Sequence, residues 1–206
     1  MQSYESHLNG DLNWALLEGS MHFEGNSAVH RTLRRLATRL DELGVDYAIA
    51  GGMALFFHGY RRFTEDVDVL VTAEGLQQIH DSLDGLGYVR PFEKSKNLRD
   101  AETGVKIDFL VSGQYPGDGK PGPIAFPDPA LVSEIIEGTH VLELPRLIEL
   151  KMASGAAPGR LKDLADVQEL IRTLNLPQKY FLGLEPSLHE SYERLWSEAQ
   201  LERMDE

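Results

Sequence analysis

Residues 46–58 read DYAIAGGMALFFH, and residues 66–71 read DVDVLV. The first stretch begins as a short β-prone run, turns at Gly51-Gly52 and continues as an apolar run that Gly59 ends, which predicts a strand, a tight turn and a short helix. The second alternates polar and apolar residues before it becomes wholly apolar, which predicts a strand that leaves a core at the surface. Strands and helices therefore alternate in this part of the chain.

The neighbouring segments extend this pattern in both directions. Leucines and a valine recur at four-and-three spacing after Ser27, and Gly44 follows them, so we expect a capped helix there. A second helix is predicted over residues 74–86, and further strands at 88–89 and 105–111. Residues 112–129 are rich in proline and glycine, which is typical of an exposed connection. Beyond them, helices are predicted over residues 130–136, 145–155, 160–174 and 187–203.

This order predicts an α+β fold, with a short mixed β-sheet flanked by helices and a mostly helical C-terminal part. We expect three regions: an N-terminal arm over residues 1–26, a core over 27–115, and a mostly helical region over 116–206. A chain of 206 residues with 42% hydrophobic residues is long enough for one compact core with a helical extension.

Composition excludes several classes of function. The chain has no cysteine, which rules out disulfides, thiolate metal sites and a cysteine nucleophile. Its net charge of -13 disfavours nonspecific binding to nucleic acid, which depends on neutralising phosphates. Because neither a signal peptide nor a membrane-length apolar run is evident, we expect a soluble, cytoplasmic protein with no membrane partner.

Three aspartates are candidate metal ligands. In a strand, Asp66 and Asp68 project from the same face about 6.6 Å apart along the chain, and two such carboxylates repel each other unless a proton or a cation intervenes. Oxygen-only ligands suit Mg²⁺ or Mn²⁺. Asp108 lies among apolar residues in the strand 105–111, and if that strand is a neighbour, three carboxylates converge and can hold two metals. Alternatively, Asp66 and Asp68 line an edge strand and Asp108 pairs with Lys106 or an arginine.

The glycine turn is the second feature of the candidate site. Gly51-Gly52 opens a helix after a strand, so its backbone N–H groups are available to an anion such as a triphosphate, although Gly-Gly also permits close packing alone. Gly51-Gly52, thirteen further residues, Asp66-Val67-Asp68-Val69 and a separate strand with Asp108 together resemble the polymerase-beta-like nucleotidyltransferase superfamily. Within it, the chain looks closest to small prokaryotic, toxin-type (abortive-infection AbiEii-like) transferases. The likeness covers residues 46–111.

The resemblance implies a nucleotidyltransferase fold and transfer of a nucleotide from an NTP by in-line attack on the α-phosphoryl group. Gly51 and Gly52 would hold the NTP phosphates, Asp66 and Asp68 would bind both metals, and Asp108 would help to activate the acceptor hydroxyl. Many members have Gly-Ser where this chain has a glycine at position 52, so the contact of a serine hydroxyl with phosphate is missing here.

Further residues are candidates for nucleotide binding. Arg61 and Arg62 precede Asp66 in a loop where a guanidinium could meet the polyphosphate, or could simply be solvated. Toxin-type relatives have a lysine at a point similar to Lys151, which could equally be a solvated helix residue. The stretch from Arg160 to Asp166 resembles their R-x-K-D-x-x-D segment, so Asp163 or Asp166 could orient Lys151 or a bound base, although carboxylates also favour a first helical turn.

The sequence leaves the acceptor open among a small molecule, an RNA 3′ end such as that of tRNA, and a protein hydroxyl. The polar side of the first predicted helix is the candidate RNA-facing patch, with plain solvation of its arginines as the alternative: Arg31, Arg34, Arg35 and Arg39. Two hypotheses of another class remain: a toxin paired with an antitoxin, and a degenerate fold that acts by protein binding. Retention of all three carboxylates disfavours degeneracy.

Overall fold

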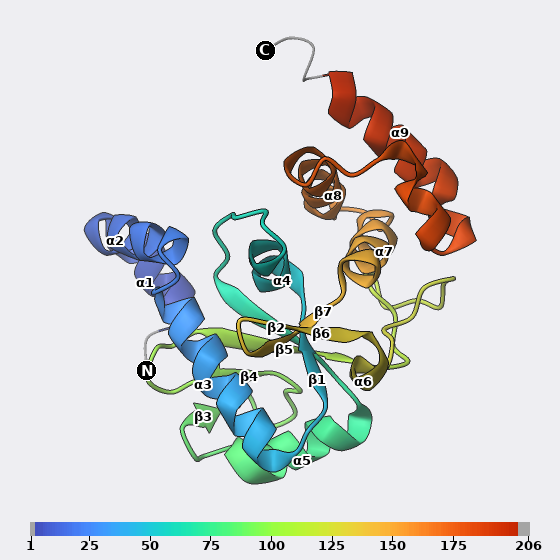
Figure 1. Cartoon of the computed structure of the whole chain (residues 1–206). Helices are drawn as coiled ribbons and strands as arrows, with labels where there is room; N and C mark the ends of the chain where they lie inside the picture. Colours follow the sequence, from blue (N-terminus) through green and yellow to red (C-terminus); the bar gives the residue numbers. More distant parts are fainter. Residues whose placement is uncertain (1–2, 202–206) are drawn as a thin grey trace.

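The computed structural model describes residues 3–201, in which a seven-stranded sheet forms the centre (Figure 1). The strand order is β3-β4-β5-β2-β1-β7-β6. The strands are β1 (Tyr47–Ile49), β2 (Asp66–Val71), β3 (Tyr88–Val89), β4 (Leu98–Asp100), β5 (Lys106–Val111), β6 (Ser133–Ile136) and β7 (Thr139–Leu142). Parallel pairs (β2 with β5, β1 with β7) occur beside antiparallel ones, so the sheet is mixed, as predicted.

Helices cover both faces of the sheet. They are α1 (Tyr4–Gly10), α2 (Leu12–Phe23), α3 (Ala28–Leu43), α4 (Gly51–Phe57), α5 (Ala73–Leu83), α6 (Pro129–Val132), α7 (Leu144–Gly155), α8 (Leu161–Thr173) and α9 (His189–Leu201), with short 3₁₀ turns at Gln178–Gly183 and Pro186–Leu188. Residues 1–2 of the predicted arm and residues 202–206 of the predicted C-terminal region lie outside the described residues. Within residues 3–201, no helix has the length and apolar character that a membrane crossing requires.

Helix α3 forms where its leucine spacing predicts it. The Ser27 side chain accepts a hydrogen bond from the backbone N–H of His30 and so caps the first turn, and Gly44 ends the helix. Its buried stripe includes Leu33, Leu36 and Leu40. Helices α3 and α5 lie on one side of the sheet, with α4 and α7 on the other (Figure 1).

The two faces of β2 explain its alternating sequence. Val67, Val69 and Val71 are fully buried on the face toward α3 and α5. Asp66 and Asp68 alternate with them and face α4 and α7. Because β2 lies between β5 and β1, it is a central strand and not an edge strand. The carboxylates therefore occupy the middle of the sheet.

The predicted helix over residues 130–136 is wrong in its second half. Helix α6 ends at Val132, and the chain then forms the hairpin of β6 and β7. The two residues between Ile136 and Thr139 are Glu137 (φ 51°) and Gly138 (φ 77°), the left-handed pair that a tight hairpin turn requires. The β-branched residues on both sides fit this pairing better than a helix.

Strand β7 also joins the C-terminal region to the core, since Ile49 of β1 pairs with Val141. The predicted boundary at residues 115–116 falls in the connection between β5 and α6, and strands from both sides of it belong to one sheet. Helices α7, α8 and α9 then stack on one another above the face that carries the aspartates (Figure 1).

Candidate active site

The three predicted aspartates converge. Strands β2 and β5 are parallel and in a register that places Asp68 opposite Asp108, while Asp66 precedes Asp68 by two residues on the same face. One ligand oxygen from each of the three carboxylates lies within 4.8 Å of the others. Each aspartate is partly accessible to solvent. The spacing along the chain thus becomes a compact acidic cluster.

The three carboxylates of this cluster repel one another. Burial, and then the charges of Asp66 and Asp108, raise the pKa of Asp68 to about 7. Lys106 offsets part of the charge, because its Nζ lies 2.7 Å from Asp108 Oδ2. This ion pair is the one that the alternative interpretation expected. Three clustered oxygen ligands fit Mg²⁺ or Mn²⁺, and the donor set therefore agrees with the predicted cofactor.

Two neighbouring residues that the sequence did not predict donate hydrogen bonds to Asp66 and Asp108. Thr64 Oγ1 donates to Asp66 Oδ1 at 2.8 Å. Asn97 donates its amide to Asp108 Oδ1, and its Oδ1 accepts the backbone N–H of Phe109 at 3.1 Å. Thr64 could have been noticed as the hydroxyl two residues before Asp66. Asn97 carries no such signal, since it reaches the site only through the pairing of β4 with β5.

The glycine turn lies directly against the aspartates. Gly51 has φ 55°, and a Cβ at this position would lie 1.7 Å from Asp68 Oδ2. A Cβ at Gly52 would lie 2.6 Å from Thr64 Oγ1. Glycine is therefore required at both positions by close packing, and at Gly51 by the left-handed backbone as well. The turn also brings the start of α4 to the carboxylates, where an anion could meet its backbone N–H groups.

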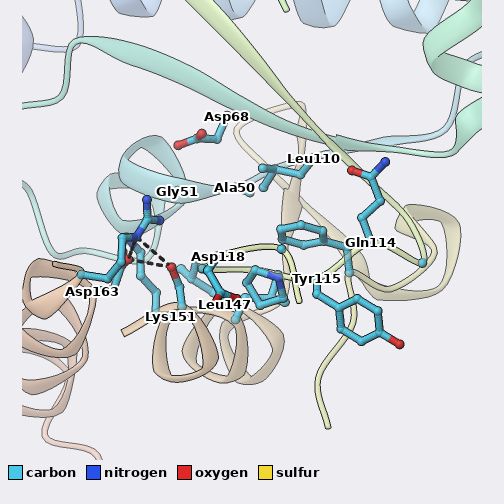
Figure 2. A pocket seen from close by; sticks show the side chains of 18 of the residues that line it. Ala50, Gly51, Asp68, Leu110, Gln114, Tyr115, Asp118, Leu147, Lys151 and Asp163 are labelled. Atoms are coloured by element: carbon cyan, nitrogen blue, oxygen red, sulfur yellow. Dashed lines mark hydrogen bonds and ion pairs between the residues drawn. The ribbon is translucent and has the colours of Figure 1, made fainter. Parts of the chain in front are cut away.

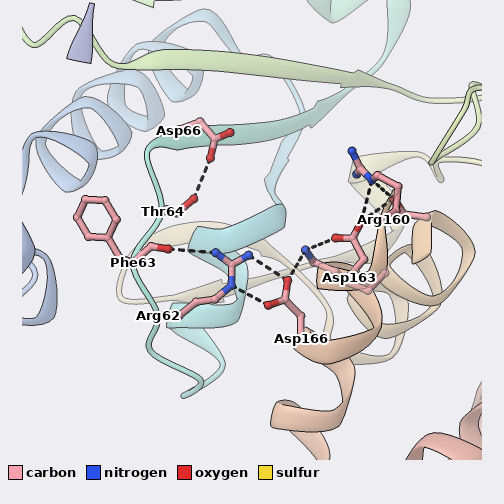
Figure 3. Close-up of polar contacts among 9 residues, drawn as sticks. Arg62, Phe63, Thr64, Asp66, Arg160, Asp163 and Asp166 are labelled. Atoms are coloured by element: carbon pink, nitrogen blue, oxygen red, sulfur yellow. Dashed lines mark hydrogen bonds and ion pairs between the residues drawn. The ribbon is translucent and has the colours of Figure 1, made fainter. Parts of the chain in front are cut away.

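The predicted arginines take different positions. Arg62 makes a bidentate ion pair with Asp166 of α8, with Nε 2.7 Å from Oδ1 and Nη2 2.9 Å from Oδ2 (Figure 3). The guanidinium of Arg61 lies 5.4 Å from the centre of the Phe56 ring. Arg62 thus ties the loop before β2 to the C-terminal helices, although it also lines the cavity that contains the aspartates.

Lys151 is not a solvated helix residue. Its Nζ lies 2.7 Å from Asp163 Oδ1 and 2.7 Å from Asp166 Oδ2, and its side chain is 11% exposed. Arg160 also bonds to Asp163 (Figure 3). The Ser154 hydroxyl donates to the same carboxylate at 2.8 Å. Burial opposes the change, but Lys151, Ser154 and Arg160 together lower the pKa of Asp163. Both Asp163 and Asp166 thus contact Lys151, while the role of Lys151 in nucleotide binding stays a prediction.

Two cavities meet at this site. One, of about 350 Å³, is lined by the three aspartates, by Arg62, Lys162 and Thr64, and by other polar residues or glycines. The other, of about 810 Å³, extends from Gly51 and Asp68 beneath the connection after β5 (Figure 2). Asp68, Lys151, Arg160 and Asp163 line both. All three aspartates therefore border the smaller cavity, and Asp68 also borders the larger one.

The arginines of α3 are occupied by neighbours. Arg35 bonds to Asp100 and Glu102, Arg39 pairs with Glu42 at 2.6 Å, and Arg31 and Arg34 donate to the carbonyls of Asn26 and Gly25. Their role as an RNA-facing patch stays a prediction that these contacts do not favour.

No protein-family model matches the chain, and no curated protein matches it. Similar solved structures include ANT(2")-Ia in complex with adenylyl-2"-tobramycin, with 12% identity over 84% of this chain and 97% of that chain and a TM-score of 0.49. An antigenic nucleotidyltransferase-like protein from Paracoccidioides brasiliensis is 18% identical over 68% of this chain and 74% of that chain, with a TM-score of 0.43. JHP933 from Helicobacter pylori is 14% identical over 84% and 89%, with a TM-score of 0.41. Because these TM-scores lie below 0.5, the geometry of the site carries the functional argument.

Proposed function

We propose that this chain is a metal-dependent nucleotidyltransferase that transfers an NMP from an NTP to an acceptor hydroxyl. The observation that carries the proposal is the register of β2 and β5, which gathers Asp66, Asp68 and Asp108 beside the glycine turn and a polar cavity. In the reaction, the acceptor oxygen forms a bond to the α-phosphorus, the bond from that phosphorus to the bridging oxygen breaks, and pyrophosphate leaves.

The three aspartates would hold Mg²⁺ or Mn²⁺, which when bound neutralises charge on the phosphates and favours ionisation of the acceptor hydroxyl. Thr64 and Asn97 fix the orientation of Asp66 and Asp108 through the hydrogen bonds described above. Asp108 would take the proton of the acceptor. Gly51 and Gly52 let the start of α4 lie against Asp68 and Thr64, so that its backbone N–H groups would meet the phosphates beside the carboxylates. Lys162 and Arg160 line the smaller cavity, where their charges would attract the phosphates.

Calorimetric titration with each NTP, with and without Mg²⁺ or Mn²⁺, tests this function. We expect metal-dependent binding of at least one NTP by the native chain, and its loss in the Asp66→Asn/Asp68→Asn double variant. Asp81→Asn, at an exposed aspartate on α5, is the matched control and should bind as the native chain does. If the native chain binds no NTP under any of these conditions, the proposed activity is wrong.

A toxin within a toxin–antitoxin pair is a second candidate role, with the same chemistry. The observation that favours it is the contact of Lys151 with Asp163 and Asp166, because these residues form the part of the sequence that resembles toxin-type transferases. Growth after induced expression distinguishes the roles. Arrest that Asp66→Ala abolishes supports a catalytic toxin, whereas arrest that survives this change points to protein binding. Normal growth favours an acceptor whose modification is harmless.

A further inference from the structure

The loop of residues 61–65 follows α4 and ends directly before Asp66. It belongs to no helix or strand, so its position depends on contacts made by side chains. Thr64 of this loop donates to Asp66 Oδ1 at 2.8 Å, and Arg62 pairs with Asp166 of α8 (Figure 3). The contacts that hold the loop therefore also determine where the Asp66 carboxylate lies.

The N-terminal arm holds this loop from its other side. His22 of α2 is fully buried, and its Nε2 lies 3.1 Å from the carbonyl oxygen of Arg62. The centre of the His22 ring is 5.0 Å from that of the Phe63 ring. In Figure 3, the Arg62 guanidinium and the Phe63 ring point to opposite sides of the loop. One buried histidine thus contacts both the backbone and an aromatic side chain of the loop.

The direction of each hydrogen bond around His22 follows from its partners. A carbonyl oxygen can only accept, so His22 Nε2 carries a proton and donates it to Arg62. Burial lowers the pKa of His22, and in the neutral ring Nδ1 accepts from Ser27 Oγ at 3.3 Å. His30 Nδ1 in turn donates to Ser27 Oγ at 2.9 Å. The series of donors therefore runs from α3 through α2 and ends at the carbonyl of the loop.

A buried carboxylate fixes the helix that carries this histidine. Glu18 of α2 is 3% exposed, and its Oε2 accepts hydrogen bonds from the Tyr4 hydroxyl at 3.1 Å and the backbone N–H of Ala28 at 2.9 Å. These bonds join α2 to α1 and to the start of α3. His22 is therefore a donor with a fixed position.

We propose that His22 is a positioning residue for metal binding, which acts on Asp66 through the loop of residues 61–65. The inference rests on the proposed function and gives the N-terminal arm a role in it. Among the described residues, His22 lies neither in the acidic cluster nor in the walls of the two cavities beside it, so its effect is indirect. Its donor fixes the carbonyl of Arg62, and two residues further along the chain Thr64 holds Asp66.

Two amide substitutions at His22 separate this hydrogen bond from the other contacts of the ring. His22→Gln places an amide nitrogen as many bonds from the backbone as Nε2 and can donate to Arg62, whereas the amide of His22→Asn reaches only the Nδ1 position. In calorimetric titration with the preferred NTP and Mg²⁺, we expect His22→Asn to bind roughly tenfold more weakly, and His22→Gln to stay within about threefold of the native chain. His22→Leu, which has no donor, should behave as His22→Asn does.

His189→Leu is the matched control. It removes a hydrogen bond of the same kind, from His189 Nε2 to the carbonyl of Leu184 at 3.0 Å, in the C-terminal region. This variant should bind NTP as the native chain does. Thermal melting of each variant confirms that it is folded at the temperature of the titration.

Hydrogen exchange of the backbone amides in residues 61–65, measured without metal or nucleotide, reports on the loop directly. We expect faster exchange in His22→Asn than in the native chain, because the loop has lost the bond that holds its carbonyl. His22→Gln should restore slow exchange, and His189→Leu should leave it unchanged.

The inference is overturned if folded His22→Asn and His22→Leu bind NTP normally, or if His22→Gln loses as much affinity as His22→Asn, because the donor then has no effect of its own. Faster exchange in the loop with normal NTP binding also overturns it. If neither donor-free variant folds while His22→Gln does, the histidine serves folding and the inference is wrong. If the native chain itself binds no NTP, the proposed function fails before any variant is compared, and the inference falls with it.

Discussion

At the scale of single residues, the site depends on the absence of a side chain at Gly51. A side chain there would overlap the Asp68 carboxylate and would also strain a backbone at φ 55°. We expect Gly51→Ala to displace Asp68 and to abolish metal-dependent NTP binding in calorimetry. Gly19→Ala on α2 is the matched control, since its Cβ would meet no atom within 4 Å. Normal binding by Gly51→Ala would contradict the role given to this turn.

Some residues of the site are predictable from local sequence patterns, and others are not. Asp66, Asp68 and Gly51 were predicted because period-two alternation and a glycine turn are local properties of the chain. Asn97 was not predicted, since it immediately precedes β4 and reaches Asp108 only through the pairing of β4 with β5, which no local pattern reveals. The sequence left Lys151 open between a nucleotide contact and a solvated helix residue, and only the packing of α7 against α8 shows that it is buried.

At the scale of elements, Lys151 joins α7 to α8, and Asp166 continues the connection to Arg62 in the loop before β2. Removing the lysine leaves buried carboxylates without their partner. We expect Lys151→Met to lower the free energy of unfolding by about 3–5 kcal/mol in urea denaturation. Lys120→Met removes an exposed lysine from an exposed ion pair and should leave unfolding unchanged. Equal effects of the two changes would show that the buried network is not stabilising.

Helices α2 and α3 are joined by buried histidines. Ser27 Oγ lies 3.3 Å from His22 Nδ1 and 2.9 Å from His30 Nδ1, and His22 Nε2 bonds to the carbonyl of Arg62 at 3.1 Å. Burial, His22 and Arg34 lower the pKa of His30 to about 4, and burial also lowers the pKa of His22. Both rings are therefore neutral in the native fold near pH 7.

This depressed pKa gives His30 a defined effect on stability. The unfolded chain binds the proton first, so the stability present above pH 6.5 is lost as the pH falls toward 4. We expect His30 alone to remove roughly 2 kcal/mol between pH 7 and pH 5. Urea denaturation of native and His30→Gln chains at pH 7, 6 and 5 measures this. The variant should lose less stability over the range, and parallel losses would contradict the assignment.

At the scale of the whole molecule, the sheet and the site both need the C-terminal region. Strand β7 covers the edge of β1, and α7 supplies Lys151 and part of the wall of the larger cavity. We expect a chain of residues 1–115 to lack cooperative thermal unfolding and NTP binding, because β1 would become an uncovered edge. A truncated chain that melts cooperatively would instead support residues 27–115 as an independent domain.

The sequence by itself determined the elements around the aspartates and the chemistry that three carboxylates favour, because alternation, helical spacing and glycine turns act over a few residues. It did not reveal the hairpin of β6 and β7, whose short strands resembled the end of a helix. The tertiary structure alone decided the parallel register of β2 with β5, the burial of Lys151 between Asp163 and Asp166, and the meeting of β5 and α7 around the larger cavity. Each of these brings together segments far apart in the chain, and their meeting depends on the packing of the whole core rather than on any local pattern.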